Sequence, residues 1–309
     1  MSTRSWALVA LFVVNLIYGV NYVVAKGLMP EVIGPSGFIL LRVIGATALF
    51  WVMRAFMHER VAWSDALRLV LCAVTGVTLN QLMFFNGLMR TTPVHASLIM
   101  VATPVLVLAM SGIYIGERIT WPKLLGVALG AGGALTLVFV RPDSGTGAAT
   151  LLGDLFILIN ASSFAIYLVL VKPLMGKYSA TTVMSWTFLL GTMMVLPFGL
   201  SELSAVQWSA FSPGIWGSVA FVVVMVTFVA YLLNTWALRH VNPGVVGTFI
   251  YLQPLLATFF TWAQLRTGIE LPGKPPTPDA TGGTMQWVCG AAIFLGVHLV
   301  TRADRRAQE

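Results

Sequence analysis

The sequence has little charge of either sign. Charged residues make up only 9% of the chain and hydrophobic residues 58%, whereas soluble domains usually carry about 25% charged residues. Eighteen basic and eleven acidic side chains are too few to coat the surface of a soluble protein of 309 residues. The composition excludes an ordinary soluble enzyme and a disordered chain. It also excludes a nucleic-acid-binding protein, because the basic residues lie between apolar runs and form no basic face.

Residues typical of catalytic and metal sites are also scarce. The two cysteines, Cys72 and Cys289, lie inside apolar segments, as small buried hydrophobic residues do. The four histidines are scattered, with no His-Glu-x-x-His helix, and there is no Gly-x-Ser-x-Gly turn or phosphate-binding loop. We therefore expect a protein that is not an enzyme and needs no metal or cofactor.

Long apolar runs dominate what is present. A helix needs about 20 mostly apolar residues to cross the hydrocarbon core. Ten stretches meet this requirement, and they predict an all-α membrane protein with ten transmembrane helices. The predicted spans are Trp6–Lys26, Pro35–Met57, Leu67–Met89, Val94–Ile115, Lys123–Val140, Leu152–Met175, Ala180–Leu200, Gly214–Ala237, Gly244–Gln264 and Gln286–Thr301.

The basic residues are unequally divided between the two sides of these spans. Twelve fall on the side that holds both chain ends, five fall on the other side, and Arg42 lies within a span. Positive charge is retained in the cytoplasm. The asymmetry predicts a multi-pass protein of the cell (inner) membrane with both termini cytoplasmic.

The two halves of the chain resemble each other. Lys26-Gly27-Leu28-Met29 matches Lys172-Pro173-Leu174-Met175 at an offset of 146 residues, and Gly45 matches Gly191 at the same offset. Pro104 matches Pro254 at an offset of 150. We expect a first repeat over residues 1–145 and a second over 146–309. Each has five spans, and an odd number inverts the second copy, as in secondary carriers.

The chain resembles the EamA-type carriers of the drug/metabolite transporter superfamily. The residues that carry the resemblance are Tyr18-Gly19-Val20-Asn21-Tyr22, Leu41-Arg42, Thr103-Pro104, Gly116-Glu117-Arg118 and Tyr251-Leu252-Gln253-Pro254. The resemblance implies ten helices, five plus five inverted, around a central cavity. One departure is that the family's second Gly-Glu pair reads Gly268-Ile269-Glu270 here and is followed by a Pro-rich insertion, residues 272–285.

Polar residues recur on one face of several spans. Asn15, Tyr18 and Tyr22 are three and four residues apart, so they share a helix face. Uncompensated amides and phenols are costly in lipid, so these faces should point inward, where they either line a cavity or join helices. The substrate-binding candidates are Asn15, Tyr18, Asn21, Tyr22, Asn80, Gln81, Asn160, Ser163, Tyr167, Trp186 and Tyr251.

Three further residues stand out at mid-membrane. Pro104 and Pro254 are repeat-related and predict a pair of bends, which either gate the transport path or only shape packing. Arg42 lies roughly 10 Å from the end of its span, at 1.5 Å per residue. Its cation either attracts a substrate carboxylate or acts structurally, by reaching the headgroups or bracing a helix.

Together these features predict a secondary transporter that exports small metabolites by alternating access. Amino acids are the favoured substrates, because a polar cavity with tyrosines and Trp186 suits a zwitterion with an apolar side chain. A drug or hydrophobic-cation exporter is the alternative within transport; an intramembrane enzyme and a lipid scramblase are alternatives of other classes. The expected partners are a small-molecule substrate and membrane lipid, but no nucleic acid. The small-residue faces of spans five and ten either buttress the bundle or contact a second copy of the chain.

Overall fold

The computed structural model describes residues 2–29, 32–90, 99–140, 150–253, 255–256, 259–260, 266 and 284–308, and every regular element within them is a helix. The α-helices are α1 (Thr3–Leu28), α2 (Pro35–Ala55), α3 (Ala66–Ala73), α4 (Leu79–Leu88), α6 (Thr103–Ile115), α7 (Trp121–Val140), α8 (Leu151–Met175), α9 (Ala180–Ser204), α10 (Pro213–Phe221), α11 (Ala230–Ala237), α12 (Pro243–Phe249) and α14 (Thr284–Gln308). Two π-helical segments, η2 (Val74–Thr78) and η4 (Val222–Val229), join α3 to α4 and α10 to α11. Two short 3₁₀ helices are η1 (Trp63–Asp65) and η3 (Trp208–Ala210).

The prediction of an all-helical membrane protein is confirmed in its coarse form. Six helical stretches of the described part are long and apolar enough to cross a membrane. The predicted fourth and ninth spans contain the shorter helices α6 and α12. The six long stretches support a multi-pass protein, but they do not establish all ten predicted spans. The junction between the predicted repeats at residue 145 lies outside the described residues.

Local sequence explains where several helices begin and end. Ser179 caps α9 by accepting a hydrogen bond from the Thr182 amide at 3.2 Å, and Thr150 caps α8 in the same way. Gly116 ends α6 at a φ of +68°, a left-handed conformation that glycine adopts without strain.

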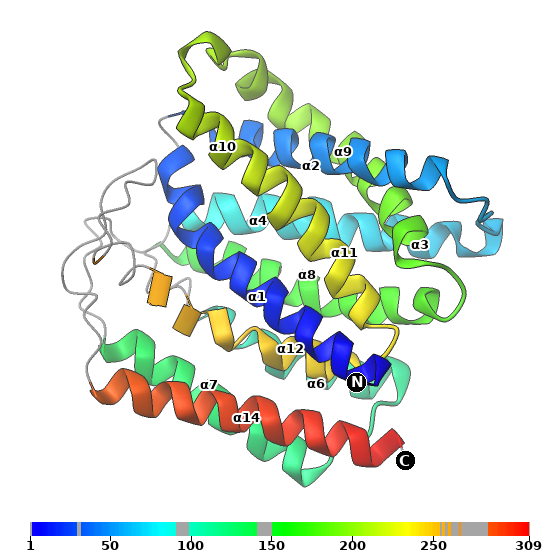
Figure 1. The fold of residues 1–309 in the computed structure, drawn as a ribbon, viewed down its shortest axis with the longest axis vertical. Coiled ribbons are helices and arrows are strands. Elements are labelled where there is room, and N and C mark those ends of the chain that lie inside the picture. Colours follow the sequence, from blue (N-terminus) through cyan, green and yellow to red (C-terminus); the bar gives the residue numbers. More distant parts are fainter. Residues whose placement is uncertain are drawn as a thin grey trace.

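The helices form a layered bundle with a tight pair at each edge (Figure 1). Helices α2 and α9 pack together at one edge and α7 and α14 at the opposite edge, with α1, α4, α8, α11 and α12 between them. The α7–α14 pair is close because a Cβ added at Gly126 would lie 2.7 Å from the Gly296 carbonyl oxygen. Small residues allow this backbone approach between membrane helices.

Repeat-related contacts join α2 to η4 and α9 to η2. A Cβ on Gly45 would lie 2.5 Å from Val223 Cγ1, and a Cβ on Gly191 would lie 2.6 Å from Val77 Cγ1. Gly45 and Gly191 are 146 residues apart, and so are Val77 and Val223. The two contacts are therefore equivalent, and the offset of the first two spans continues into η2 and η4.

Carboxylates near the ends of α2 and α9 show that the two helices run antiparallel. Glu59, after α2, accepts a hydrogen bond from the Ser179 amide at the start of α9 at 3.0 Å. Glu202, at the end of α9, accepts one from the Gly37 amide in the first turn of α2 at 2.9 Å. Each helix thus ends where its counterpart from the other repeat begins.

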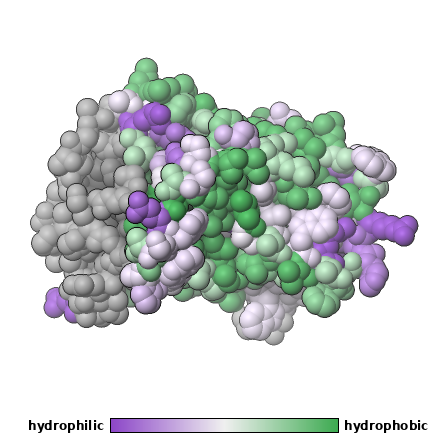
Figure 2. Space-filling model, turned by 90° about the horizontal axis from the view of Figure 1, so that it is seen from above, coloured by the Kyte–Doolittle hydropathy of each residue, from purple (hydrophilic) through white to green (hydrophobic). Residues whose placement is uncertain are grey.

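The two chain ends meet at one end of the bundle (Figure 1). Arg4 Nη2 lies 3.0 Å from Asp304 Oδ2, which joins the start of α1 to the end of α14. The visible face in Figure 2 is apolar over its middle, and hydrophilic residues gather toward its ends. That distribution fits a surface in contact with lipid.

Candidate functional site

Turns interrupt the predicted fourth and ninth spans beside helices α6 and α12 in the part of the chain that the structure describes. Val101 and Ala102 form a turn before α6, and Ile250 and Tyr251 form a turn after α12. The two turns are 149 residues apart in sequence, close to the repeat offset of 150. Short i to i−3 hydrogen bonds, such as Tyr251 N to Thr248 O at 3.2 Å, replace the regular helical ladder there.

Pro104 lies beside the first of these turns. It was expected at a bend inside a continuous helix, but the structure places it in the first turn of α6. A missing N–H leaves no helical carbonyl unpaired in a first turn, so this proline starts a helix. Pro254 lies outside the described residues. A gating role for either proline stays a prediction.

One face of the η4–α11 helix collects polar contacts from three other helices. Arg42 Nε donates to Thr227 Oγ1 at 3.1 Å, and Gln81 Nε2 donates to the Tyr231 hydroxyl at 3.4 Å. The hydroxyls of Tyr167 and Thr235 are 3.0 Å apart. Thr227, Tyr231 and Thr235 are four residues apart and therefore share a face. We call these six residues the central polar cluster: Arg42, Gln81, Tyr167, Thr227, Tyr231 and Thr235.

Arg42 is the charged member of this cluster. It is only 5% exposed, and its guanidinium lies 5.5 Å from the centre of the Phe38 ring and 5.4 Å from that of Phe85. Tyr18 of α1 and Tyr231 lie near it. The predicted residues Tyr18, Arg42 and Tyr167 thus come from three helices to one region.

The predicted polar face of α8 contacts the π-helical segment η2 and its neighbour α4. Ser163 Oγ donates to the Thr75 carbonyl at 2.5 Å, and Asn160 Nδ2 donates to the Asn80 carbonyl at 2.7 Å. The Tyr167 ring lies against Gly76. These bonds join helices, which was one of the two expected roles. Asn80 takes part through its backbone carbonyl.

Several predicted residues keep a buried polar atom without a hydrogen-bond partner in the described part of the chain. Buried polar atoms are nearly always paired, so each unpaired one is a candidate position for water or a ligand. These atoms are Asn21 Oδ1, Gln81 Oε1, Asn160 Oδ1, Trp186 Nε1 and the Tyr251 hydroxyl.

Asn15 is engaged elsewhere. Its Nδ2 donates to the Leu11 carbonyl at 2.7 Å, and its Oδ1 accepts from Gln253 Nε2 at 3.1 Å. It links α1 to the residues after the α12 turn. The side chain of Tyr22 lies outside the described residues. Substrate contact by either residue stays a prediction.

Trp186 packs against α2. Its ring packs edge-on against Trp51 at a centroid distance of 5.4 Å, and the Arg54 guanidinium lies 5.6 Å from its ring centre. Phe188 is the α9 aromatic that meets the cluster, with its ring centroid 5.0 Å from that of Tyr231. Trp186 and Phe188 are two residues apart, and two residues correspond to a rotation of about 200° around the helix axis. Their rings therefore lie on different sides of α9. A substrate role for Trp186 stays a prediction.

Thr227, Thr235 and Phe188 were not among the predicted site residues. The signal for the two threonines was present, because Thr227, Tyr231 and Thr235 recur every four residues in a segment where Asn234 is the one other polar residue. Phe188 gave no signal, since one more phenylalanine in an apolar helix is typical of any core.

A second group of charges lies at the end of the bundle that holds both chain ends. Lys123 Nζ lies 2.8 Å from Glu117 Oε1 and 3.5 Å from Asp304 Oδ1, and none of these side chains is more than 1% exposed. Glu117 also accepts a hydrogen bond from the Gly244 amide at 3.3 Å. We call Arg4, Glu117, Lys123 and Asp304 the buried ion cluster.

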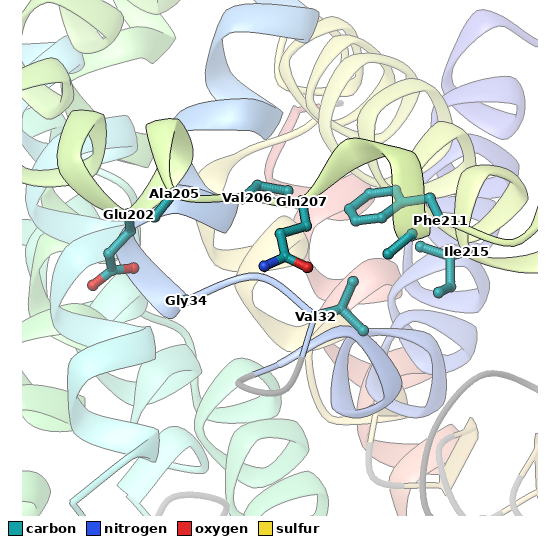
Figure 3. Close-up of a pocket in the computed structure, with 9 residues that line it drawn as sticks. Val32, Gly34, Glu202, Ala205, Val206, Gln207, Phe211 and Ile215 are labelled. Atoms are coloured by element: carbon teal, nitrogen blue, oxygen red, sulfur yellow. The ribbon is translucent and has the colours of Figure 1, made fainter.

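Two open pockets lie at the ends of the bundle. One has a volume of about 550 Å³ and lies where the α1–α2 connection meets the α9–α10 connection. In Figure 3, Gln207 and Val32 face each other across it, with Phe211 and Ile215 alongside. The other, of about 480 Å³, includes Lys172, which donates to the Val241 carbonyl at 2.7 Å. Neither pocket is lined by a predicted substrate-binding residue.

A bundle of long apolar helices, with repeat-related contacts and two interrupted helices, defines a multi-pass membrane protein built from an internal repeat. The profile of the EamA-like transporter family matches residues 5–139 and again residues 151–273. The chain belongs to this family, and the resemblance inferred from the sequence is confirmed.

The relatives carry transporter names. An "Uncharacterized transporter" of Archaeoglobus fulgidus is 27% identical over 97% of this chain and 98% of its own length. A "Probable terminal-alkyne amino-acid exporter" of Streptantibioticus cattleyicolor is 24% identical over 87% of this chain and 84% of its own. A solved crystal structure, 17% identical, matches 99% of this chain and 100% of that chain with a TM-score of 0.75, which shows the fold. The family and the relatives' names indicate a transporter rather than an enzyme.

Proposed function

We propose that this protein is a secondary carrier that exports small metabolites, with amino acids as its substrate class, by alternating access. Its fold would be ten spans in two inverted five-helix repeats around a central cavity. The observation that carries the proposal is the repeat-related pair of interruptions at α6 and α12. Carriers built from inverted repeats bind substrate near the midplane at interrupted helices.

The central polar cluster supports amino acids as the substrate class. It combines hydroxyls and an amide with aromatic rings and has a single cation, a set that suits a zwitterion with an apolar side chain. The cation disfavours the alternative of a hydrophobic-cation exporter, since like charges repel in a medium of low dielectric constant. A relative named as a probable amino-acid exporter points the same way.

Counterflow in proteoliposomes tests this proposal. The purified full chain is reconstituted with a high internal concentration of one unlabelled amino acid, and uptake of the same labelled amino acid is followed for a panel of neutral amino acids. We expect transient accumulation above that of protein-free liposomes for apolar members of the panel. Accumulation of labelled lipid in the opposite leaflet without amino-acid counterflow would instead identify a scramblase, and counterflow of lipophilic cations alone would identify a drug carrier.

The orientation is a separate part of the proposal. Both termini would lie in the cytoplasm of a cell whose inner membrane holds the protein, because the basic residues favour that side. A single cysteine at Ser2, in a background without Cys72 and Cys289, should resist an impermeant thiol reagent in intact cells. One at Gln207, exposed at the other end of the bundle, should react. Labelling of the cysteine variant at Ser2 and not of the variant at Gln207 would show that the protein has the opposite orientation.

A further inference from the structure

The most informative residue in the centre of the molecule is Arg42. A guanidinium has five N–H donors. In the described residues it makes one hydrogen bond, from Nε to Thr227, and it is flanked by the rings of Phe38 and Phe85. No ion pair joins it to a carboxylate in the described part of the chain. A buried cation is costly without an opposite charge, so this one is poised for an anion from outside the protein.

The repeat argues that the fold does not need this cation. Arg42 and Phe188 are 146 residues apart, as are Phe85 and Tyr231. The contact of Arg42 with the Phe85 ring, at 5.4 Å, is therefore equivalent to the contact of Phe188 with the Tyr231 ring, at 5.0 Å. An apolar ring fills the same place in the second repeat, so a charge there serves something other than packing.

A second unsatisfied group, Gln81 of α4, contacts the same face of the η4–α11 helix. Gln81 is 3% exposed, its Nε2 is directed at the Tyr231 hydroxyl, and its Oε1 is buried without a partner in the described residues. Arg42 donates a hydrogen bond to Thr227, and Gln81 donates one to Tyr231. Thr227 and Tyr231 are four residues apart, so the two contacts lie on one face of the η4–α11 helix.

Free N–H donors on a guanidinium and a free amide oxygen, which contact one helix face, suit the carboxylate and the ammonium group of an α-amino acid. We propose that Arg42 binds the carboxylate of the transported substrate and that Gln81 Oε1 accepts a hydrogen bond from its ammonium group. Arginine suits this task because its planar fork binds a carboxylate through two parallel hydrogen bonds. The inference rests on the proposed amino-acid transport and names the groups that recognise the substrate backbone.

Three matched ligands separate the two contacts. Leucine carries both charged groups, leucinamide lacks the carboxylate, and 4-methylpentanoate lacks the ammonium. Each is tested as a competitor of labelled leucine counterflow and, independently of transport, by the thermal shift that it gives the purified protein. We expect wild-type protein to bind leucine at least about tenfold more tightly than either analogue, the ratio expected when a charge-assisted pair worth ~1.4 kcal/mol is lost.

Substitutions then assign each contact to a residue. Arg42→Phe copies the side chain that the second repeat uses, so it should fold, and it should bind leucine and leucinamide equally. Arg42→Lys keeps the charge but loses the fork, and it should retain part of the discrimination. Gln81→Leu should abolish the preference for leucine over 4-methylpentanoate while keeping that over leucinamide. Arg54→Gln, on the same helix but outside the cluster, is the matched control and should keep both preferences.

The outcomes distinguish this inference from the function on which it rests. If wild-type protein moves amino acids and Arg42→Phe keeps the wild-type preference for leucine over leucinamide, the inference is wrong while the proposed function stands. If Arg42→Phe unfolds and Arg42→Lys shows full wild-type preference, Arg42 is a structural brace and the inference is equally overturned. If no amino acid is moved but 4-methylpentanoate shifts the wild type and not Arg42→Phe, the proposed function fails and the carboxylate site stands.

Discussion

The two repeats have the same side chains at the contacts that frame the centre and different ones within it. Gly45 on Val223 is matched by Gly191 on Val77, and Glu59 capping α9 is matched by Glu202 capping α2. Within the centre, Arg42 corresponds to Phe188, Gln81 to Thr227 and Phe85 to Tyr231, each at an offset of 146 residues.

This difference separates two requirements that the sequence must meet, the packing of the two repeats and the recognition of a substrate. The packing of α2 on η4 and of α9 on η2 needs small residues at the close approaches, and it needs them twice because the contact occurs twice. A substrate with a positive and a negative end has no two-fold symmetry, so a site that recognises it cannot use identical residues from both repeats. The repeat therefore accounts for the scaffold, and departures from the repeat indicate the site.

The largest expected loss of stability follows from a change in the buried ion cluster, which contains residues of both repeats. Lys123→Met leaves Glu117 and Asp304 buried without their common cation, and breaking a buried pair in this way costs ~3–5 kcal/mol. Unfolding in mixed micelles with increasing SDS measures the loss of free energy. Lys177→Met is the control: its ammonium pairs with Asp65 but is 54% exposed, so its loss should cost below ~1 kcal/mol. Equal losses for the two variants would contradict a buried cluster.

The next prediction tests whether the Gly45–Val223 and Gly191–Val77 contacts are equivalent. Gly45→Ala and Gly191→Ala each bring a Cβ too close to a valine methyl group, at 2.5 and 2.6 Å. Overpacking of this kind should destabilise each variant by ~1–3 kcal/mol, by nearly the same amount. Val223→Ala should rescue the first and Val77→Ala the second, but not the reverse. Gly217→Ala, with open space around its Cβ, should be neutral; a loss there would mean that any added methyl is harmful.

The sequence predicted the fold better than the site, for physical reasons. The apolar runs predicted a helix start at Pro35, a helix end at Met175 and a helix start at Ala180. Helices α2, α8 and α9 begin or end at these residues. The repeat offset of 146 residues identifies the contacts that are equivalent in the two halves of the chain. The interruption before Pro104 was placed inside a helix because periodicity does not reveal a turn of two residues. The direction of Trp186 depended on how α9 is rotated against α2, which packing decides.

A smaller effect tests the interrupted helices. Pro104→Ala restores an N–H and removes the restriction that proline imposes on the preceding residue, so the helix can extend through Val101 and Ala102. If the interruption belongs to the transport path, counterflow should slow about tenfold, equivalent to ~1.4 kcal/mol in the barrier, while the protein stays folded. Pro213→Ala, at the start of α10, is the matched proline control and should keep the wild-type rate. Unchanged counterflow in both variants would leave Pro104 as a packing feature.

The smallest effect concerns the two carboxylate caps. Glu59→Gln and Glu202→Gln should each cost ~1 kcal/mol, since each weakens the hydrogen bond at a helix start. Burial raises the pKa of Glu59, but hydrogen bonds from Thr182 and Ser179 outweigh burial and hold its pKa below the ordinary value. The stability due to a lowered carboxyl pKa is present above the unfolded-state pKa and is lost as the pH falls through the folded-state pKa.

The same caps also test the comparison by titration. Between pH ~7 and ~3, the wild type should lose more stability than Glu59→Gln, because the variant has no carboxylate to protonate at this position. The difference in unfolding free energy between the two proteins should therefore shrink with falling pH and vanish below the folded-state pKa of Glu59. A difference that stays constant over this range would mean that the glutamine variant is weaker for reasons of packing and that the charge at the start of α9 contributes nothing.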